Sequence, residues 1–592
     1  MYLKCNRRFK DGKEHRYWSL VESRRCAGGR VVQRPILYLG EINDSQREAW
    51  IRSIEAFDED AHCQKRLTLF ASDVELSSER ADAVRVRLSE FELRRSRQWG
   101  ACWLFVQLWE QLGLDSFWRE KLGVSREGTD WEHVLQILTA YRLIDPGSEW
   151  RLHRQWYEHS AMGDLLGADV RVAEKDTLYR CLDRLLEHKR ALFEHLTARW
   201  RDLFGVRFEV LLYDLTSTYF EIDPPDPAED KRRFGYSRDK RSDCVQVVIA
   251  LIVTPEGFPL AYEVLAGNTA DSTTLRGSLE RIEHQYGKVD RIWVMDRGIP
   301  TEDTLRYMRT SEPPIRYLVG TPKGRLAKFE RELLLKPWHD ARPGVQVKLL
   351  AQDDELYVFA QSHDRIAKER AMRRRQLKKL WARLAQLSAM TLTSKNLLMK
   401  LGAARQQYPA AWRLVDVQVD DDTPRFTYTL RKDKLREVRR REGRYLLRTN
   451  LTAADPAEVW RYYIQLVQVE EAFKNLKGDL AIRPVYHQSP ARIEAHIFVS
   501  FLAYCVHVTL RHRLRQHAPG LTPRAVLEKF AALHMVDAWF PTTDGRWLVF
   551  ARYTQPEKEH RLLLATLDLD LPKQSPPRIT AHGQLAAPTT AV

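Results

Sequence analysis

Two aspartates stand beside apolar runs that are typical of buried strands. Asp214 follows Val-Leu-Leu-Tyr within residues 208–221, and Asp296 ends the run Ile-Trp-Val-Met. A carboxylate at such a place is costly unless it is paired, hydrogen bonded or bound to a metal. One aspartate alone is typical of strand-end capping, but two on strands that can be neighbours favour a divalent cation, which needs several oxygen ligands. The pattern therefore predicts a metal site that requires a third acidic ligand.

The segment 455–480 predicts a helix that can supply this ligand. At about 100° per residue, one face of that helix carries five residues: Tyr463, Leu466, Glu470, Lys474 and Lys477. A carboxylate and two ammonium groups in a row fit a site that binds a cation and a phosphodiester, because the cation and the lysines together neutralise phosphate oxygens. Glu471 points about 80° away from the Tyr463 direction, so Glu470 is the preferred ligand and Glu471 the alternative. An amphipathic surface helix with ordinary charge pairs explains the same segment.

Length and charge indicate a basic protein of several domains. At roughly 100 to 200 residues per domain, 592 residues predict about three to five domains. The 44% of hydrophobic residues excludes a chain that is disordered throughout. The 95 Lys and Arg residues exceed the 80 Asp and Glu residues, so the net charge of +15 favours a polyanionic partner: DNA, RNA or an anionic membrane.

The apolar segments argue against a membrane protein. The most apolar stretch, residues 497–510, has 14 residues, which is too short to span a bilayer and fits a buried core helix. The first residues are basic but contain no apolar run of the signal-peptide type, so we expect the protein in the cytosol. The seven cysteines are scattered without a Cys-x-x-Cys pair, which argues against a disulfide framework or a cysteine zinc site.

Changes in sequence texture divide the chain into segments. Residues 206–324 predict strand, strand, strand, helix, strand, helix and strand, which is a mixed sheet that helices can cover on both faces. The other expected segments are a basic β-hairpin arm at 1–44 with its turn at 27–29, a helical domain at 45–205, a strand-rich insertion with a very basic helix at 325–451, long helices at 452–512, a C-terminal region at 513–571 and a disordered tail at 572–592.

Three basic segments are candidates for DNA contacts. The segment 231–241 holds six Lys or Arg residues, and we expect Arg232, Arg233 and Lys240 to follow a DNA backbone near the acidic site. A solvated loop is the alternative. We expect sequence recognition within residues 1–205, either by a helix at 173–189 or by the hairpin, since helices and ribbons read base edges in grooves. Plain packing helices are the alternative there.

These blocks together resemble the DDE-type transposases of insertion sequences. The similar blocks are Tyr-Asp-Leu-Thr-Ser-Thr-Tyr-Phe-Glu at 213–221, residues 235–275, Val-Met-Asp-Arg-Gly-Ile at 294–299, and the segment 463–504. The closest likeness is to the branch with a Tyr, Arg, Glu, Lys signature spaced Y-x2-R-x3-E-x6-K. Tyr463, Glu470 and Lys477 match that spacing, while Leu466 occupies the arginine position. The resemblance implies that Asp214, Asp296 and Glu470 form a metal-binding catalytic triad.

The resemblance also implies a fold and an activity. The fold would be multidomain α+β and α/β, with an RNase H-like mixed sheet as the catalytic core at 206–324 and 452–512, interrupted by the insertion. The activity would be binding of terminal inverted repeats, cleavage with two Mg²⁺ ions, which Mn²⁺ can replace, and joining of the 3′ hydroxyls to target DNA. The resemblance further implies a homodimer that acts at the nucleoid of a prokaryotic cell. In some relatives, an inserted tryptophan holds a flipped base, and Trp338 is the nearest candidate, with core packing as its alternative.

Two other functions are compatible with these residues. One is a metal-dependent nuclease that does not join strands. The other is a catalytically silent DNA-binding regulator derived from a transposase, although the presence of all three acids argues against silence.

Overall fold

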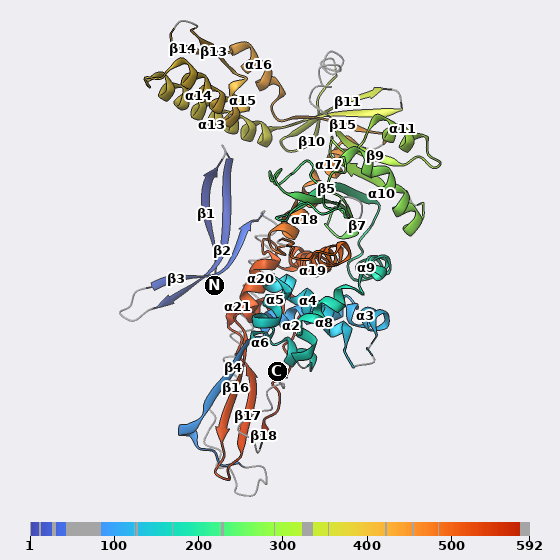
Figure 1. Ribbon diagram of the computed structural model, residues 1–592, viewed down its shortest axis with the longest axis vertical. Helices are drawn as coiled ribbons and strands as arrows, with labels where there is room; N and C mark the ends of the chain where they lie inside the picture. Colours follow the sequence, from blue (N-terminus) through green and yellow to red (C-terminus); the bar gives the residue numbers. More distant parts are fainter. Residues whose placement is uncertain are drawn as a thin grey trace. The chain divides into compact units, whose positions relative to one another are not determined.

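The chain forms two compact units. Figure 1 labels the helices and strands. The computed structural model describes residues 2–10, 13–25, 31–42 and 84–580, apart from gaps at 124, 126–127, 169, 227–229, 289, 322–335, 353, 421–422, 453–454 and 484. Unit 1 comprises Met1–Asn6, Tyr17–Arg291 and Gln465–Val592, and unit 2 comprises Arg7–Arg16 and Ile292–Ile464.

The N-terminal arm has three strands instead of the expected two. Strands β1 (Tyr2–Lys10), β2 (Lys13–Arg25) and β3 (Val31–Glu41) form a sheet in this order, with β2 and β3 antiparallel. The predicted pair is therefore confirmed, while its turn at 27–29 lies outside the described residues. β1 carries four Lys or Arg residues and no β-branched residue, so strand propensity does not predict it.

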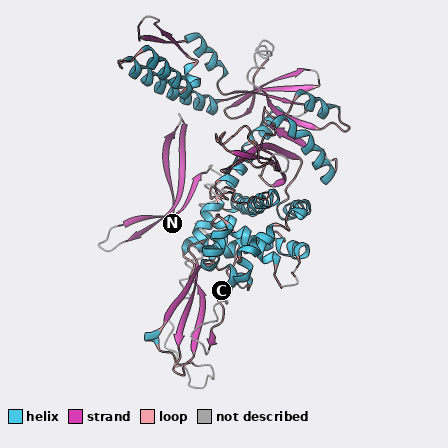
Figure 2. Ribbon diagram, in the orientation of Figure 1, coloured by secondary structure: helices cyan, strands magenta, loops and turns pink. Residues whose placement is uncertain are grey.

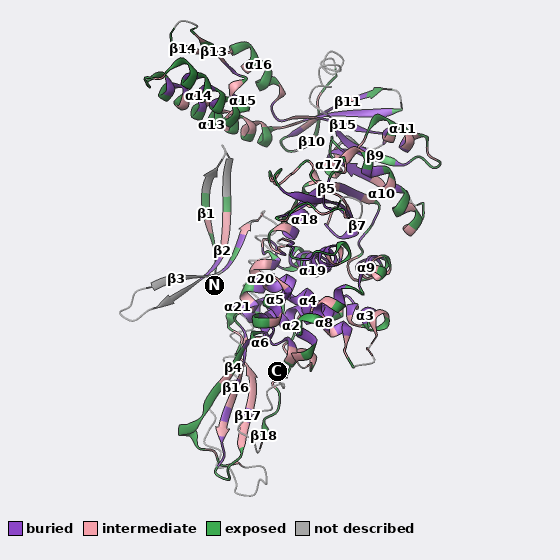
Figure 3. Cartoon of the chain, in the orientation of Figure 1, coloured by how far each residue is buried: buried purple, intermediate pink, exposed green. Residues whose placement is uncertain are grey.

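Unit 1 is built around a long buried helix, α19 (Pro490–His517), as Figure 3 shows. The longer helices that surround it are α2 (Gly100–Gln111), α3 (Leu114–Leu122), α4 (Trp131–Ile144), α8 (Lys175–Leu182) and α9 (Lys189–Phe204). The short helical segments are α5 (Glu149–Arg151), η2 (Leu152–Trp156), α6 (Tyr157–His159), α7 (Met162–Leu166), η3 (Val170–Ala173) and η4 (Leu186–His188). Among the described helices, α19 alone is long and apolar enough to cross a membrane, and its burial confirms the predicted core helix.

The expected recognition helix at 173–189 is not one helix. α8 ends at Leu182, and a turn and η4 separate it from α9. The guanidinium of Arg184 lies 4.5 Å from the ring centre of Trp131, and the ammonium of Lys189 lies 3.8 Å from that of Tyr262. These two basic side chains pack on aromatic rings of their own unit, so the packing alternative holds for them.

A four-stranded antiparallel sheet joins distant parts of unit 1 (Figure 2). Its order is β18 (Arg578–Thr580), β17 (Trp547–Tyr553), β16 (His534–Pro541) and β4 (Glu92–Gln98). The neighbouring helices are η1 (Leu88–Glu90), α20 (Pro523–Phe530) and α21 (Lys558–Thr566). Two expectations are corrected: the segment 45–205 contains a strand, and the tail from residue 572 is ordered as far as β18. Residues 43–83 and 581–592 lie outside the described part of the chain.

Three antiparallel strands carry the first aspartate. β5 (Val210–Phe220), β6 (Val245–Val253) and β7 (Pro259–Ala266) lie in this order, and Asp214 pairs with Leu251 across β5 and β6. Helix α10 (Asp271–Tyr286) follows, and Tyr213 of β5 donates a hydrogen bond to its Thr274. These elements confirm the predicted strand, strand, strand and helix.

Unit 2 contains a mixed sheet. Its strand order is β8 (Ile292–Met295), β9 (Arg316–Thr321), β15 (Arg444–Thr449), β12 (Glu355–Ser362), β11 (Val345–Gln352) and β10 (His339–Arg342). β8 and β9 are parallel, helix α11 (Glu302–Thr310) connects them, and the other pairs are antiparallel. The expected insertion is therefore not wholly a separate domain, because its strands continue the sheet of β9 through β15. With its many helices, the fold is mixed α/β.

A helical part of the insertion has a hydrophobic core of its own. It consists of α13 (His363–Ser388), α14 (Ser394–Gln407), α15 (Pro409–Trp412), β13 (Val415–Val419), β14 (Phe426–Leu430) and α16 (Lys432–Arg441). Leucines of α13 and α14 form most of the core, including Leu380, Leu384 and Leu397. α13 confirms the predicted basic helix, and residues 363–443 are called the basic module below.

The expected helix at 455–480 is broken in the middle. α17 (Pro456–Ile464) packs on strands of unit 2, and α18 (Val467–Lys477) packs on β5 and β6 of unit 1. No Gly or Pro lies between residues 457 and 477, so the sequence carries no signal for the break. The predicted shared face therefore applies only to Glu470, Lys474 and Lys477.

Candidate functional site

Asp214 lies within β5 and is half-buried. One of its carboxylate oxygens accepts a hydrogen bond of 2.8 Å from the backbone N–H of Leu215. Tyr213 points toward α10, as its hydrogen bond to Thr274 shows. Because successive side chains of a strand point to opposite faces, Asp214 lies on the face of β5 that is turned away from α10.

The two adjacent glutamates of helix α18 have different surroundings. Glu470 is exposed, and its carboxylate forms no hydrogen bond or ion pair with the residues that the structure describes. Glu471 instead forms an ion pair of 3.1 Å with Arg511 of α19, and Arg515 lies 3.8 Å away. Glu471 is thus used to fasten α18 to α19. Of the two carboxylates, Glu470 is the one that remains available to a ligand.

Asp296 and Tyr463 both belong to unit 2. Asp296 is exposed and directly follows β8. Tyr463 packs against β9, where a Cβ added to Gly320 would lie 2.7 Å from the tyrosine hydroxyl. Burial, and then the charge of Asp296, raise the pKa of Tyr463 to about 12. The signature tyrosine is therefore a neighbour of the second aspartate.

The predicted acids are thus distributed over both units. β5 and α18, which pack together in unit 1, carry Asp214 and Glu470, and the end of β8 in unit 2 carries Asp296. A cavity of about 170 Å³ adjoins the segment after Asp296, and Arg297, Glu302 and Gly320 are among its lining residues.

Cationic side chains gather around Asp239 in unit 1. Lys477 and Arg483 each lie 3.0 Å from its carboxylate. Burial lowers the pKa of Lys477, while the hydrogen bond to Asp239 opposes that shift. The guanidinium groups of Arg483 and Arg241 lie 4.7 and 4.8 Å from the ring centre of Tyr219, near the end of β5. The sequence predicts Lys477 but not Arg483 or Tyr219, because only tertiary contacts connect them.

The segment 231–241 is not uniformly available to DNA. Arg232 is only 4% exposed, forms an ion pair of 2.5 Å with Asp230, and donates to the backbone oxygen of Gln488. This burial corrects the expectation that Arg232 contacts a DNA backbone. Arg233 is half-buried and pairs its backbone with Gln246, while Lys240 is exposed. Of the three predicted residues, Lys240 has the most accessible charge.

Trp338 packs inside unit 2. The indole ring of Trp338 stacks on the ring of Phe359, with 5.6 Å between the ring centres. The ammonium of Lys348 lies 4.7 Å from the centre of the Trp338 ring. Trp338 borders a small core that includes Leu350 and Leu446. These contacts favour the packing alternative for Trp338.

A buried carboxylate joins distant elements of unit 1. Glu149 of α5 lies 3.3 Å from Nε2 of His487 and 3.2 Å from Nδ1 of His496, and the guanidinium of Arg142 lies 3.8 Å away. Within the described residues, this is the group of His, Cys, Asp or Glu side chains whose atoms are close enough to share an ion. Arg142 already supplies the positive charge that the carboxylate needs, so the cluster is balanced as a hydrogen-bond network.

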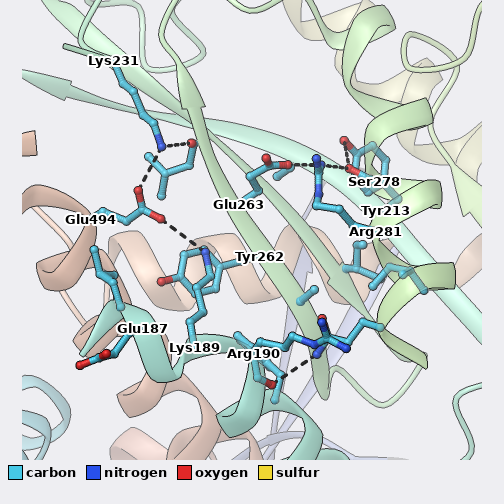
Figure 4. A pocket seen from close by; sticks show the side chains of 18 residues that line it. Glu187, Lys189, Arg190, Tyr213, Lys231, Tyr262, Glu263, Ser278, Arg281 and Glu494 are labelled. Carbon is cyan, nitrogen blue, oxygen red and sulfur yellow. Dashed lines mark hydrogen bonds and ion pairs between the residues drawn. The ribbon is translucent and has the colours of Figure 1, made fainter. Parts of the chain in front are cut away.

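A larger cavity of about 380 Å³ lies beside β5, β6 and β7, as Figure 4 shows. Lys231 and Lys189 reach the carboxylate of Glu494 at 3.0 and 3.5 Å, and Arg281 pairs with Glu263. Tyr213 lines this cavity, whereas Asp214 points to the opposite face of β5. The cavity therefore lies on the other face of β5 from Asp214, and Lys189, Lys231 and Arg281 are paired with its acidic residues Glu494 and Glu263.

Comparisons with known proteins identify the family. The family described as Transposase DDE domain matches residues 209–506, which is half of the chain. The family described as IS1634 family transposase, N-terminal domain, matches residues 3–65. No curated protein matches the sequence. A cryo-EM structure of the piggyBac transposase synaptic complex with hairpin DNA is similar over 73% of this chain and 78% of the piggyBac chain, at 10% sequence identity. The TM-score of 0.33 is too low for a conclusion about fold or function. On the strength of the two family matches, the chain belongs to the DDE-type transposases of insertion sequences.

Proposed function

We propose that this transposase binds the terminal inverted repeats of its element, cleaves the DNA there and joins the freed 3′ hydroxyls to target DNA. The observation that carries the proposal is the extent of the matched DDE domain, which includes Asp214, Asp296 and Glu470. These residues lie within a strand, directly after a strand and on a helix, respectively. We assign them as the catalytic triad, and we take the strands and α18 that carry them as an RNase H-like core.

The donor set fits hard divalent cations. Three carboxylates offer oxygen ligands of the kind that Mg²⁺ prefers, and Glu470 has no competing partner among the described residues. Asp214, Asp296 and Glu470 would hold two Mg²⁺ ions, or Mn²⁺ in their place. The ions would supply activation of the attacking oxygen and charge stabilisation at the leaving oxygen.

The cations of unit 1 would hold the DNA strand near these acids. Lys474 is exposed on the same helix as Glu470, one turn further along. Lys477 and Arg483 flank Asp239, and Lys240 is exposed beside it. Ammonium and guanidinium groups contact phosphate oxygens without reading the bases, so this cluster positions the backbone. Cleavage and joining at two element ends would be performed by a homodimer, and we propose that it acts at the nucleoid of a prokaryotic cell.

The test replaces each acid singly in the full chain. Asp214→Ala, Asp296→Ala and Glu470→Ala should each abolish cleavage of a duplex that contains the element end, while end binding stays close to that of the unchanged protein. Loss of a direct metal ligand should cost more than the roughly 10- to 100-fold that changes in outer-shell partners cost. Gel assays of cleavage and of strand joining, with Mg²⁺ or Mn²⁺ supplied, measure both steps.

Glu471→Ala is the matched control for the helix. It removes a carboxylate from the adjacent position and breaks the ion pair with Arg511, so stability should fall slightly while cleavage persists. Cleavage that survives Glu470→Ala and fails in Glu471→Ala would reverse the assignment. Cleavage without joining would point to a nuclease, and end binding without any cleavage in the unchanged protein would point to a silent regulator.

A further inference from the structure

Most of the net positive charge of the chain lies in the basic module. Residues 363–443 contain 21 Lys or Arg residues and nine Asp or Glu residues, a net charge of +12, whereas the whole chain carries +15. The rest of the chain, taken together, carries a net charge of only +3. A charge excess concentrated in one folded segment indicates a polyanionic partner for that segment.

Helix α13 presents this charge along its whole solvent side. Its 26 residues extend about 39 Å at 1.5 Å per residue. Leu380, Leu384 and Leu387 turn one side of the helix toward the core of the module. Four cations lie on the opposite side, are exposed, and make no ion pair within the described part of the chain: Lys368, Arg374, Lys378 and Lys379. α13 carries no acidic residue after Glu369.

Helix α16 adds further cations at the first half of α13. The buried carboxylate of Glu442, just after α16, pairs with Arg370 at 3.2 Å and with Arg373. Burial lowers the pKa of Arg373, and so do its neighbours Arg439, Arg370 and Arg374. Arg370 and Arg373 therefore share one carboxylate, and Arg439 and Arg374 lie close enough to Arg373 to repel its charge. Such an excess of like charge is unfavourable by itself, and the phosphates of a nucleic acid would relieve it.

Among the described residues of the basic module, Trp381 is the one large aromatic residue that is exposed. Proteins that hold single strands stack bases on accessible aromatic rings. The ring of Trp381 already makes an edge contact with Tyr428 at 5.0 Å. The surface offers charge rather than stacking platforms, which favours a duplex.

We propose that the basic module binds the sugar–phosphate backbone of duplex DNA through α13 and α16, without reading sequence. This interaction rests on the proposed function, because it takes the DNA of a transposition reaction as the partner. It places a second DNA contact in unit 2, separate from the cluster around Asp239 in unit 1. Its role is to increase affinity for every duplex, while the acids perform the chemistry.

The experiment neutralises the exposed side of α13 in the full chain. The variant K368Q/R374Q/K378Q/K379Q should bind duplexes of any sequence more weakly than the unchanged protein. Each phosphate contact contributes about 0.9 to the slope of log affinity against log salt, so four lost contacts should make that slope shallower by about 3 to 4. Fluorescence anisotropy with a random duplex of about 30 base pairs, at about 50 to 200 mM salt, measures the slope.

A matched control removes the same charge elsewhere. The variant R201Q/R207Q/R561Q/K573Q changes four exposed cations of unit 1 and should keep the slope of the unchanged protein. Equal slopes in the two quadruple variants would overturn the proposal. If the α13 variant loses its thermal transition, R436Q/R440Q on the exposed side of α16 provides an independent test, with an expected decrease of about 2 in the slope. A wild-type protein that binds no duplex would instead refute the proposed function.

Discussion

At the scale of single residues, burial decides what a charge can do. Arg232 and Lys240 belong to one basic segment, yet Arg232 is buried against Asp230 and Lys240 is exposed. The same difference separates Glu471, which is fixed by Arg511, from the exposed Glu470. Composition assigns such neighbours the same role. Their environments give one a structural role and leave the other available to a ligand.

Arg232→Ala should therefore affect stability rather than DNA binding. Removing one partner of a buried ion pair costs about 3 to 5 kcal/mol, because the remaining charge stays buried without compensation. The side chains of Arg232 and Asp230 are 4% and 8% exposed, so a large loss in the free energy of unfolding is expected. Thermal unfolding measured by circular dichroism tests this expectation.

Lys240→Gln is the comparison within the same segment. Its side chain is exposed, so its stability should stay within about 0.5 kcal/mol of the unchanged protein, while its affinity for DNA decreases. If the Arg232→Ala protein is stable and binds DNA more weakly, Arg232 contacts the DNA backbone as the sequence predicts.

At the scale of elements, buried polar groups hold unit 1 together. Glu149 on α5 connects to His496 on α19 and to His487 before it. Similarly, Arg97 of β4 forms a buried ion pair of 2.9 Å with Asp537 of β16. Each network joins segments that lie more than 300 residues apart. Such groups fix the relative register of their elements, because leaving one unpaired in the interior is costly.

The network around Glu149 should make the stability of unit 1 sensitive to acid. Burial, aided by Arg142, lowers the pKa of His496 from 6.5 to about 4. Between these values the unfolded chain binds a proton that the folded chain does not, so the free energy of unfolding decreases as the pH falls from 6.5 toward 4. Burial by itself raises the pKa of Glu149. Hydrogen bonds from His487 and His496 outweigh burial and hold this pKa well below its usual range. That contribution is lost only as the pH falls below the ordinary glutamate pKa of 4.5.

Melting temperatures measured between pH 7 and pH 4 test this dependence. The histidine should account for at most about 3 kcal/mol over that range. His496→Gln should give a flatter profile than the unchanged protein, whereas His284→Gln, at an exposed position of α10, should not change the profile. Parallel profiles for the unchanged protein and His496→Gln would contradict the assignment of acid sensitivity to this network.

At the scale of the whole molecule, unit 1 is assembled from both ends of the sequence. α19 contacts α2, α4 and α8, and β16 pairs with β4. Residues 17–291 and 465–592 belong to the same unit. The helical domain expected at 45–205 therefore does not have a core of its own, because its described helices α2, α4 and α8 pack on α19 and its strand β4 pairs with β16.

A fragment of residues 1–205 should consequently fail to fold cooperatively. Without α19 and β16, the buried faces of α2, α4 and β4 would be exposed to water. We expect retained helical circular dichroism, binding of the dye ANS and no sharp thermal transition, which are the properties of a state that has lost its tertiary packing. The full chain is the control. A sharp thermal transition in the isolated fragment would show that α19 is not needed for its folding.

The sequence alone determined the elements whose patterns are local. Apolar runs predicted β5, β6 and β8, together with the places of Asp214 and Asp296, because alternation and burial are visible within a few residues. The basic helix α13 and the buried helix α19 were equally visible. The family signature added Glu470 as a candidate, since its spacing lies within one short segment.

Tertiary structure decided what depends on distant partners. The break between α17 and α18, the pairing of β4 with β16, the burial of Arg232 and the contact of Glu149 with His496 have no local signal. Their free energy comes from covering apolar surface and satisfying buried polar groups with residues up to several hundred positions away. A pattern within ten or twenty residues does not specify those partners. The chemistry was therefore predictable by residue type, and the surroundings that separate a catalytic candidate from a structural charge came only from the fold.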